Sequence, residues 1–298
     1  MNVTIVIAGG SGFLGGKLAA RLESDGHRPV TLTRRPSGTN SINWTPDGSP
    51  GGLPAHLEGV DAVVNLAGES IAKGRWTASR KQALRDSRLL STRTLVRAIQ
   101  ACARPPRALI SGSAIGYYGP RGDEPVTEST EPGSDFLAGV CVEWEQEAKM
   151  AASANTRVAI VRTGLALAKE GGALGAMLLP FKLGLGATLG SGDQFMPWIH
   201  AEDWAGMVSW LIQNDRAAGA FNATAPEPVT NRVFTHTLGR VLHRPAVLHA
   251  PAFVLQAAMG EMSAMILNGQ RVLPANAEQL GFRFTYRTLE PALRSLNL

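Results

Sequence analysis

Residues 3–15 read VTIVIAGGSGFLG and decide the fold of this chain. The run from Val3 to Ala8 is short and apolar, as in a parallel strand covered on both faces, and the segment from Phe13 to Glu23 has the apolar spacing of a helix. Glycines between them allow the backbone to approach a pyrophosphate, and the start of the helix points its N–H groups at the negative charge. The spacing fits both G-x-G-x-x-G and G-x-x-G-x-x-G. We therefore predict a dinucleotide-binding turn formed by Gly9, Gly10, Ser11, Gly12, Phe13, Leu14 and Gly15.

The end of the next strand indicates which dinucleotide fits. Pro29 to Thr33 reads as that strand, and it is followed by Arg34 and Arg35 rather than by the carboxylate that an NAD site offers to the ribose hydroxyls. A 2′-phosphate needs positive charge and planar donors, which a guanidinium supplies. We predict that Thr33, Arg34 and Arg35 bind the phosphate of NADP (NADPH). A pair of solvated arginines at a strand end is the other interpretation.

Strands and helices alternate along the chain and predict the fold class. Short apolar runs predict strands at 60–66, 107–111, 158–162 and 219–223, and helical patterns cover 77–103 and 200–213. This alternation predicts an α/β fold, a Rossmann-type doubly wound parallel sheet that binds its ligand at the strand ends. We place an NADP-binding Rossmann domain at 1–164, with return segments near 195–223, and a smaller, mixed α/β substrate-binding lobe at 165–298. The lobe includes a small C-terminal domain at 248–298.

The composition excludes several classes of protein. The 298 residues are 44% hydrophobic and 18% charged, as in folded globular proteins. Lys and Arg exceed Asp and Glu by 29 − 24 = 5, which suits an anionic small molecule and is too little to predict nucleic-acid binding. No long apolar run or signal-peptide pattern occurs, so we expect no membrane association and a cytoplasmic location. Cys102 and Cys141 stand far apart and no histidines cluster, so no disulfide or metal site is expected.

Further segments resemble a known family. Asn65-Leu66-Ala67-Gly68 follows one predicted strand, Ser111-Gly112-Ser113-Ala114 ends the next, and Tyr117 lies beyond it. Gly190-Ser191-Gly192 precedes Trp198-Ile199-His200-Ala201-Glu202-Asp203. Together they resemble the extended branch of the short-chain dehydrogenase/reductase family, of the NAD-dependent epimerase/dehydratase type. The resemblance implies that Leu66, Ala67, Gly68 and Ser111 lie along the cofactor.

Other segments resemble a poorly characterised subgroup of that family, described as epimerase-family or NADP-dependent oxidoreductase proteins. They are Gly68-Glu69-Ser70-Ile71, Arg75-Trp76-Thr77, Ser87-Arg88 and Asn268-Gly269-Gln270-Arg271-Val272-Leu273-Pro274. The subgroup has a small C-terminal domain. In dimers of the family two long helices often form the interface, and here 77–103 and 137–153 are the corresponding segments, so the resemblance is compatible with a homodimer.

The catalytic pattern of the family is incomplete in this chain. In ordinary members a tyrosine four residues before a lysine acts as the general acid or base, and a serine hydrogen-bonds the substrate oxygen. Ser113 matches the serine, but Leu137 stands where the tyrosine belongs and Cys141 where the lysine belongs. Leucine cannot transfer a proton, and a neutral thiol cannot replace an ammonium.

Three hypotheses follow for the function. The first is an NADP-dependent oxidoreductase acting on an unknown carbonyl or alcohol, with Ser113 and Tyr117 as catalytic residues; Tyr117 as a mere lining residue of the pocket is equally compatible. The second is a cofactor-binding protein without chemistry, serving as a sensor or interaction module. The third is a nucleotide-sugar epimerase, which needs an acid–base pair that the sequence does not reveal. His200, beside an aromatic residue and before a helix, is interpreted as holding a loop rather than as a base.

Overall fold

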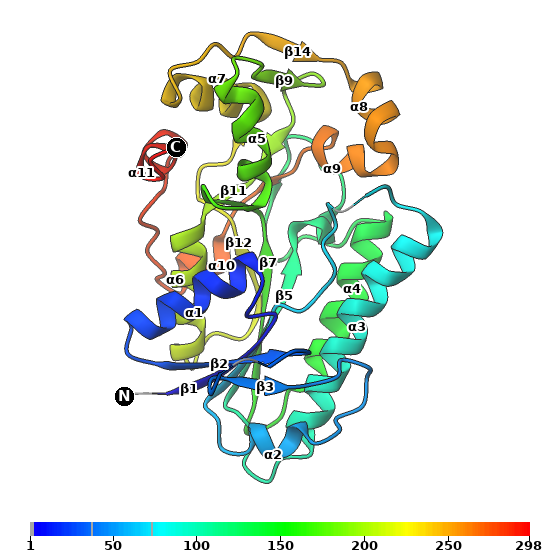
Figure 1. Cartoon of the computed structure of the whole chain (residues 1–298), viewed down its shortest axis with the longest axis vertical. Helices are drawn as coiled ribbons and strands as arrows, with labels where there is room; N and C mark the ends of the chain where they lie inside the picture. Colours follow the sequence, from blue (N-terminus) through cyan, green and yellow to red (C-terminus); the bar gives the residue numbers. More distant parts are fainter. Residues whose placement is uncertain (1–2, 37, 73) are drawn as a thin grey trace.

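The computed structural model describes residues 3–36, 38–72 and 74–298, and its centre is a seven-stranded sheet (Figure 1). The strands lie in the order β12-β7-β5-β4-β1-β2-β3, and every neighbouring pair is parallel. The order reverses between β1 and β4, which is where ligands bind in doubly wound sheets. The predicted fold class is confirmed. The strands are β1 Thr4–Ala8, β2 Arg28–Thr33, β3 Ser41–Asn43, β4 Ala62–Asn65, β5 Ala108–Ala114, β7 Arg157–Thr163 and β12 Gly219–Ala223.

Helices cover both faces of the sheet because the central strands, such as β1 and β4, are apolar and buried on both sides. Ile5 and Ile7 of β1 belong to one core with helices α1 and α6, whereas Val6 and Ala8 belong to a second core with α2, α3 and α4. Figure 1 shows α1 and α6 on one side of the sheet and α3 and α4 on the other. The bounds are α1 Phe13–Ser24, α2 Leu53–Leu57, α3 Ala78–Gln100, α4 Phe136–Lys149 and α6 Ala201–Gln213.

The remaining elements form the upper part of the molecule in Figure 1 and the connections to it. A third core joins α5, α7 and α11. Four two-stranded pairs complete this part: β8 with β11, β9 with β14, β10 with β13, and β6 with β15. The strands are β6 Pro125–Val126, β8 Leu165–Leu167, β9 Ala187–Leu189, β10 Phe195–Met196, β11 Trp198–His200, β13 Val229–Thr230, β14 Leu248–Ala250 and β15 Arg271–Val272. The helices are η1 Ile115–Tyr118, α5 Gly172–Lys182, α7 Asn231–Val241, α8 Ala252–Met259, η2 Gly260–Ser263, α9 Ala264–Leu267, α10 Ala275–Gln279 and α11 Leu289–Ser295.

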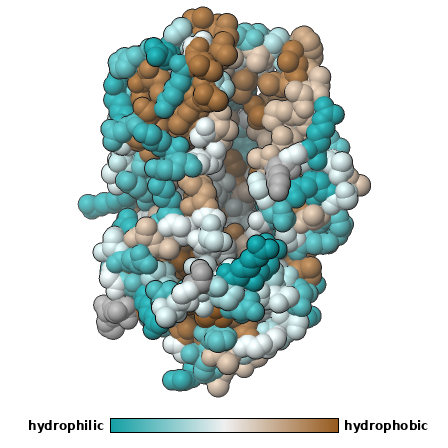
Figure 2. Space-filling view, in the orientation of Figure 1, coloured by the Kyte–Doolittle hydropathy of each residue, from teal (hydrophilic) through white to brown (hydrophobic). Residues whose placement is uncertain are grey.

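Exposed apolar side chains gather on this upper part. Figure 2 shows the hydrophobic surface concentrated at that end of the molecule, over the region of α5, β14 and α8. Leu179, Leu183, Val247 and Phe253 are among the large apolar side chains that face solvent there. No helix in the described ranges combines the length and the apolar character that crossing a bilayer requires.

The sequence predicted the long elements of the sheet domain and missed the short ones. Strand β3 and helix α2 were not predicted, because elements of 3 and 5 residues are too short to show a periodic pattern. Strand β5 extends to Ala114, three residues beyond the predicted end. Ser111 and Ser113 therefore both lie within the strand, where alternate side chains share a face.

Candidate active site

The glycine turn after β1 is closed by protein contacts. A Cβ on Gly15 would lie 2.2 Å from the carbonyl oxygen of Gly9, and a Cβ on Gly9 would lie 2.7 Å from the carbonyl carbon of Leu66. Gly9 also has a φ of +81°, which disfavours any other residue. Within the described chain, the N–H groups of Phe13 and Leu14 donate to no protein acceptor, as at any helix start. The turn thus brings bare backbone and unpaired donors to the carboxyl edge of the sheet.

Positive charge lies on one side of this turn. A Cβ on Gly10 would come within 2.6 Å of the Thr31 hydroxyl, so the turn packs directly on β2. Arg34 and Arg35 follow the end of that strand and are exposed, and no ion pair engages either of them in the described residues. The Thr33 hydroxyl accepts from the Arg35 N–H at 3.2 Å, which shapes the turn after the strand.

The segment Leu66–Gly68 lies on the other side of the turn. The buried Asn65 side chain holds it, donating to Thr92 at 2.8 Å and accepting from the Ala67 N–H at 3.2 Å. Ser111 of the neighbouring strand is fully buried, and its hydroxyl donates to the Gly112 carbonyl at 3.3 Å. The proton of the Ser111 hydroxyl is therefore used within the protein.

Ser113 belongs to a buried charged network. Its hydroxyl donates to Glu145 Oε1 at 2.8 Å, and Glu145 forms a bidentate pair with Arg162, both N···O distances being 2.8 Å. The two charged side chains are only 1% and 3% exposed. Burial alone would lower the pKa of Arg162, but the bonds to Glu145 and Tyr118 raise it instead. Arg162 therefore stays charged, and its two bonds hold the Glu145 side chain that accepts the hydrogen bond from the Ser113 hydroxyl.

The two adjacent tyrosines of η1 have different surroundings. Tyr118 is fully buried, and its hydroxyl donates to Asn222 Oδ1 at 2.6 Å while accepting from Arg162 at 2.9 Å. Burial raises the pKa of Tyr118 to about 12. Tyr117 is half-buried, and its ring stacks on the Arg162 guanidinium with 3.4 Å between the guanidinium carbon and the ring centroid. Of the two, only Tyr117 is accessible to a ligand.

Helix α4 brings the two replaced positions to this region with neither a phenol nor an ammonium group. Leu137 packs on Gly116 of η1, where a Cβ would lie 3.4 Å from the Leu137 Cβ. The Cys141 thiol lies 3.8 Å from the Ala114 carbonyl oxygen, and burial raises its pKa to about 11. At neutral pH this thiol is therefore uncharged.

Glu145 and Arg162 were not predicted from the sequence as members of the site, although each carried a signal. Arg162 ends an otherwise apolar strand pattern. Glu145 stands four residues after Cys141, so Glu145 and Cys141 share one face of α4. A charge inside an apolar element requires a partner. The sequence does not say which acid meets which arginine, since that depends on how α4 packs against β5 and β7.

His200 holds the start of α6, in line with its interpretation from the sequence. Its Nδ1 accepts the Glu202 N–H at 3.1 Å as the N-cap, and its ring packs on Tyr286 with 4.0 Å between centroids. Among the described residues, no group of histidine, cysteine or acidic side chains could hold a metal ion.

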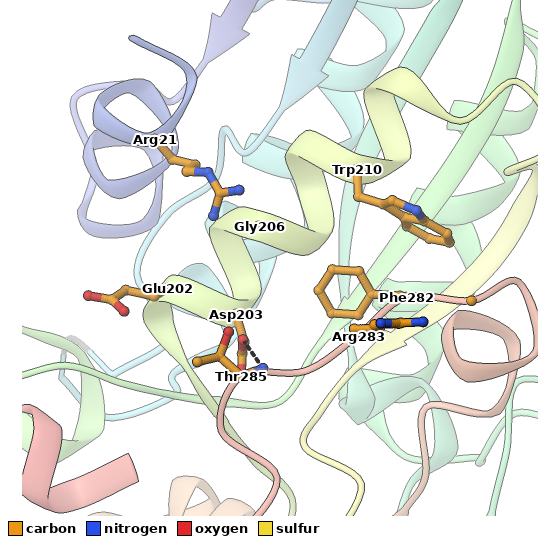
Figure 3. Close-up of a pocket in the computed structure, with 9 residues that line it drawn as sticks. Arg21, Glu202, Asp203, Gly206, Trp210, Phe282, Arg283 and Thr285 are labelled. Carbon is orange, nitrogen blue, oxygen red and sulfur yellow. Dashed lines mark hydrogen bonds between the residues drawn. The ribbon is translucent and has the colours of Figure 1, made fainter. Parts of the chain in front are cut away.

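A shallow pocket of about 390 Å³ lies elsewhere, between α1, α6 and the C-terminal segment (Figure 3). It is lined by Arg21, Glu202, Asp203, Gly206, Trp210, Gly281, Phe282, Arg283 and Thr285. None of these residues belongs to the glycine turn or to the Ser113 network. Figure 3 shows the Asp203 carboxylate bonded to the backbone of Thr285, so the pocket marks where the C-terminal segment is attached.

Comparisons with known proteins show what the chain is similar to in sequence and fold. The model of the NAD dependent epimerase/dehydratase family matches residues 5–224, and the model described as "Domain of unknown function (DUF1731)" matches residues 250–296. The epimerase family protein YfhF of Bacillus subtilis is 41% identical over 298 residues, covering 99% of this chain and 98% of its own length. The epimerase family protein SDR39U1 of Bos taurus is 38% identical over 297 residues, covering 98% and 99%. The crystal structure of human epimerase family protein SDR39U1 (isoform 2) with NADPH superposes with a TM-score of 0.92 at 35% identity, covering 98% of both chains.

Proposed function

The chain belongs to the NAD dependent epimerase/dehydratase family, and on that basis we propose that it binds NADPH and catalyses oxidoreduction of a small carbonyl or alcohol substrate. The observation that carries the proposal is the glycine turn, where backbone atoms occupy the space that a Cβ on Gly9 or Gly15 would need. The similarity to human SDR39U1, whose structure contains NADPH, supports it.

The residues along the sheet edge fit this cofactor. The free N–H groups of Phe13 and Leu14 suit a pyrophosphate at the start of α1, and the exposed Arg34 and Arg35 suit a 2′-phosphate beyond β2. A dinucleotide in this orientation extends across β4 towards Ser113 on β5. When bound, NADPH supplies a hydride for a carbonyl carbon.

Ser113 and Tyr117 have complementary roles in this proposal. The single Ser113 proton is donated to Glu145, so its oxygen accepts a hydrogen bond from the hydroxyl of an alcohol substrate. Tyr117 donates its phenol proton to the carbonyl oxygen as the carbon receives a hydride, and it then regains a proton from water, because Tyr117 is half-buried whereas Tyr118 is fully buried. The hydroxyl formed in this way is the one that can then turn to donate to Ser113. Arg162, stacked on the Tyr117 ring, positions it.

A titration with NADPH and NADH tests cofactor binding first. NADPH is expected to bind more tightly, and replacing Arg34 and Arg35 by Gln should weaken NADPH binding about 10- to 100-fold, the loss of one or two charge-assisted hydrogen bonds, with little effect on NADH. Arg28→Gln is the matched control, because Arg28 is exposed at the opposite end of β2. Equal affinity of the wild type for both cofactors would contradict the preference for NADPH.

The same proteins test the chemistry with a panel of carbonyl compounds and NADPH oxidation as the signal. Tyr117→Phe and Ser113→Ala should each reduce turnover about 100-fold or more while NADPH still binds. Turnover at the uncatalysed rate in the wild type, with tight NADPH binding, would support the sensor hypothesis instead. Conversion of a nucleotide sugar without net change in NADPH absorbance would support an epimerase.

A further inference from the structure

Arg88 of α3 reaches the region where α4 lacks a charge. Its side chain lies against Gly68, where a Cβ would be 3.3 Å from Arg88 Cγ and 3.4 Å from Cζ. On its other side the guanidinium lies 5.4 Å from the centroid of the Trp144 ring on α4. The half-buried arginine is thus held between the segment after β4 and the helix that carries Cys141.

Only part of the hydrogen-bonding capacity of Arg88 is used by the protein. Nη1 donates to the Leu84 carbonyl at 2.8 Å, and Nη2 donates to the Glu69 carbonyl at 3.1 Å. A guanidinium has five N–H groups, so three remain without an acceptor in the described parts of the chain. These two bonds fix the planar group, and the other donors are available to a ligand.

The positively charged Arg88 guanidinium lies on the side of α4 that carries the neutral Cys141 thiol. Trp144, whose ring Arg88 faces, stands three residues after Cys141 and therefore on the same side of α4. The positive charge of Arg88 correspondingly opposes the rise in the pKa of the Cys141 thiol that burial causes. Burial lowers the pKa of Arg88, yet a guanidinium remains protonated at neutral pH. Arg88 therefore brings a permanent positive charge next to the position where the family resemblance implies a lysine.

The position of Arg88 along the sheet edge indicates which part of a cofactor it meets. Arg34 follows β2, the glycine turn follows β1, Gly68 follows β4, and the Trp144 ring packs on Gly112 of β5, 3.3 Å from a Cβ there. From β2 to β5 the edge crosses three strand spacings, about 14 Å in total. With the 2′-phosphate at Arg34, Arg88 lies at the opposite, nicotinamide half.

We infer that Arg88 is the binding residue for the ribose hydroxyls of the nicotinamide half of NADPH, supplying from α3 the positive charge that α4 lacks at Cys141. This inference rests on the proposed binding of NADPH. A guanidinium suits hydroxyl oxygens flanking a negatively charged diphosphate because its donors are coplanar and its charge is permanent.

Two ligands separate the halves of the cofactor. NADPH contains both riboses, whereas adenosine 2′-phosphate 5′-diphosphate contains both bridging phosphates and lacks the nicotinamide ribose. Arg88→Met should weaken NADPH binding about 10- to 100-fold and leave the affinity for the fragment within about twofold. Arg88→Lys should recover part of the loss, because it restores charge but not the planar donors.

The matched control is Arg80→Met. Arg80 holds the same loop through Glu69, at 3.1 Å, and through the Ser70 carbonyl. Among the described residues, Arg88 and not Arg80 forms a cation–π contact with Trp144. An equal loss of NADPH affinity in Arg80→Met would mean that loop loosening is the cause and would overturn the inference. So would wild-type affinity in Arg88→Met, or an equal loss for the fragment, which would assign Arg88 to the diphosphate. Failure of the wild type to bind NADPH would instead refute the proposed function.

Discussion

Glu145 and Arg162 form an ion pair that is almost completely removed from solvent. The Coulomb attraction in such a pair compensates for the desolvation of both ions, so loss of one partner leaves an unpaired buried charge. The pair also orients Ser113, through Glu145, and both tyrosines, through Arg162. Few side chains of the candidate site are therefore independent of it.

Arg162→Met should lower the free energy of unfolding by about 3–5 kcal/mol, because Glu145 would remain buried without its counter-ion. Urea unfolding at pH 7.5 measures the change. The control is Arg85→Met, since Arg85 pairs with Glu143 at an exposed position and should lose less than about 1 kcal/mol. Similar losses in the two variants would show that the buried pair contributes no more than a surface pair.

Some residues of the candidate site belong to a local sequence pattern and others do not. The glycines, Arg34 and Arg35 stand in a contiguous pattern with a strand before and a helix after, so their positions were predictable from local spacing. Glu145, Arg162 and Arg88 lie on three different elements, α4, β7 and α3. The pairing of Glu145 with Arg162, and the contact of Arg88 with Trp144, depend on packing between elements, which no local pattern records.

Helix α6 illustrates how an element depends on its first residue. His200 caps the helix by accepting the Glu202 N–H, and it can do so only while its Nδ1 is unprotonated. Burial lowers the pKa of His200, with smaller opposing effects from Glu202 and Asp203. The ring also faces Tyr286 and lies 3.3 Å from the Ser295 hydroxyl.

The stability of the fold should therefore depend on pH through His200. Because its pKa is lower in the folded state than in the unfolded chain, the neutral ring stabilises the fold above about pH 6.5, and this contribution is lost as the pH falls. His200→Asn keeps a side-chain N-cap and should show a smaller drop in melting temperature between pH 7.5 and 5.5 than the wild type. His236→Asn, at an exposed position on α7, should behave as the wild type does. Parallel curves for all three proteins would exclude His200 as the titrating group.

The C-terminal segment packs against both the sheet domain and the upper part of the molecule. Asp203 on α6 accepts the N–H groups of Thr285 at 2.9 Å and Tyr286 at 2.8 Å, and Phe284 packs into the core beneath α6. The chain then continues to α11, which belongs to the core of the upper part with α5 and α7. One segment thus contributes to both cores.

Asp203→Ala should reduce the free energy of unfolding by about 2–4 kcal/mol, because two N–H groups lose a charged acceptor. Hydrogen exchange should accelerate at the Thr285 and Tyr286 amides before it does so in the sheet. Glu202→Ala is the control, since the neighbouring carboxylate is exposed and accepts neither amide. Unchanged exchange at these two amides would show that the segment is held by apolar packing alone.

The contacts that leave no room for a side chain at Gly9 and Gly15 also have a consequence for conformational entropy. Fixing the backbone of one residue has a conformational-entropy cost of about 1–2 kcal/mol. A disordered loop incurs this cost for each of its residues every time it closes on a ligand. Here protein atoms alone hold the turn between Leu66 and the start of α1. The entropy cost of ordering the turn is therefore incurred once, when the chain folds. Contacts between the turn and the cofactor then contribute to affinity without a further ordering cost at each binding event.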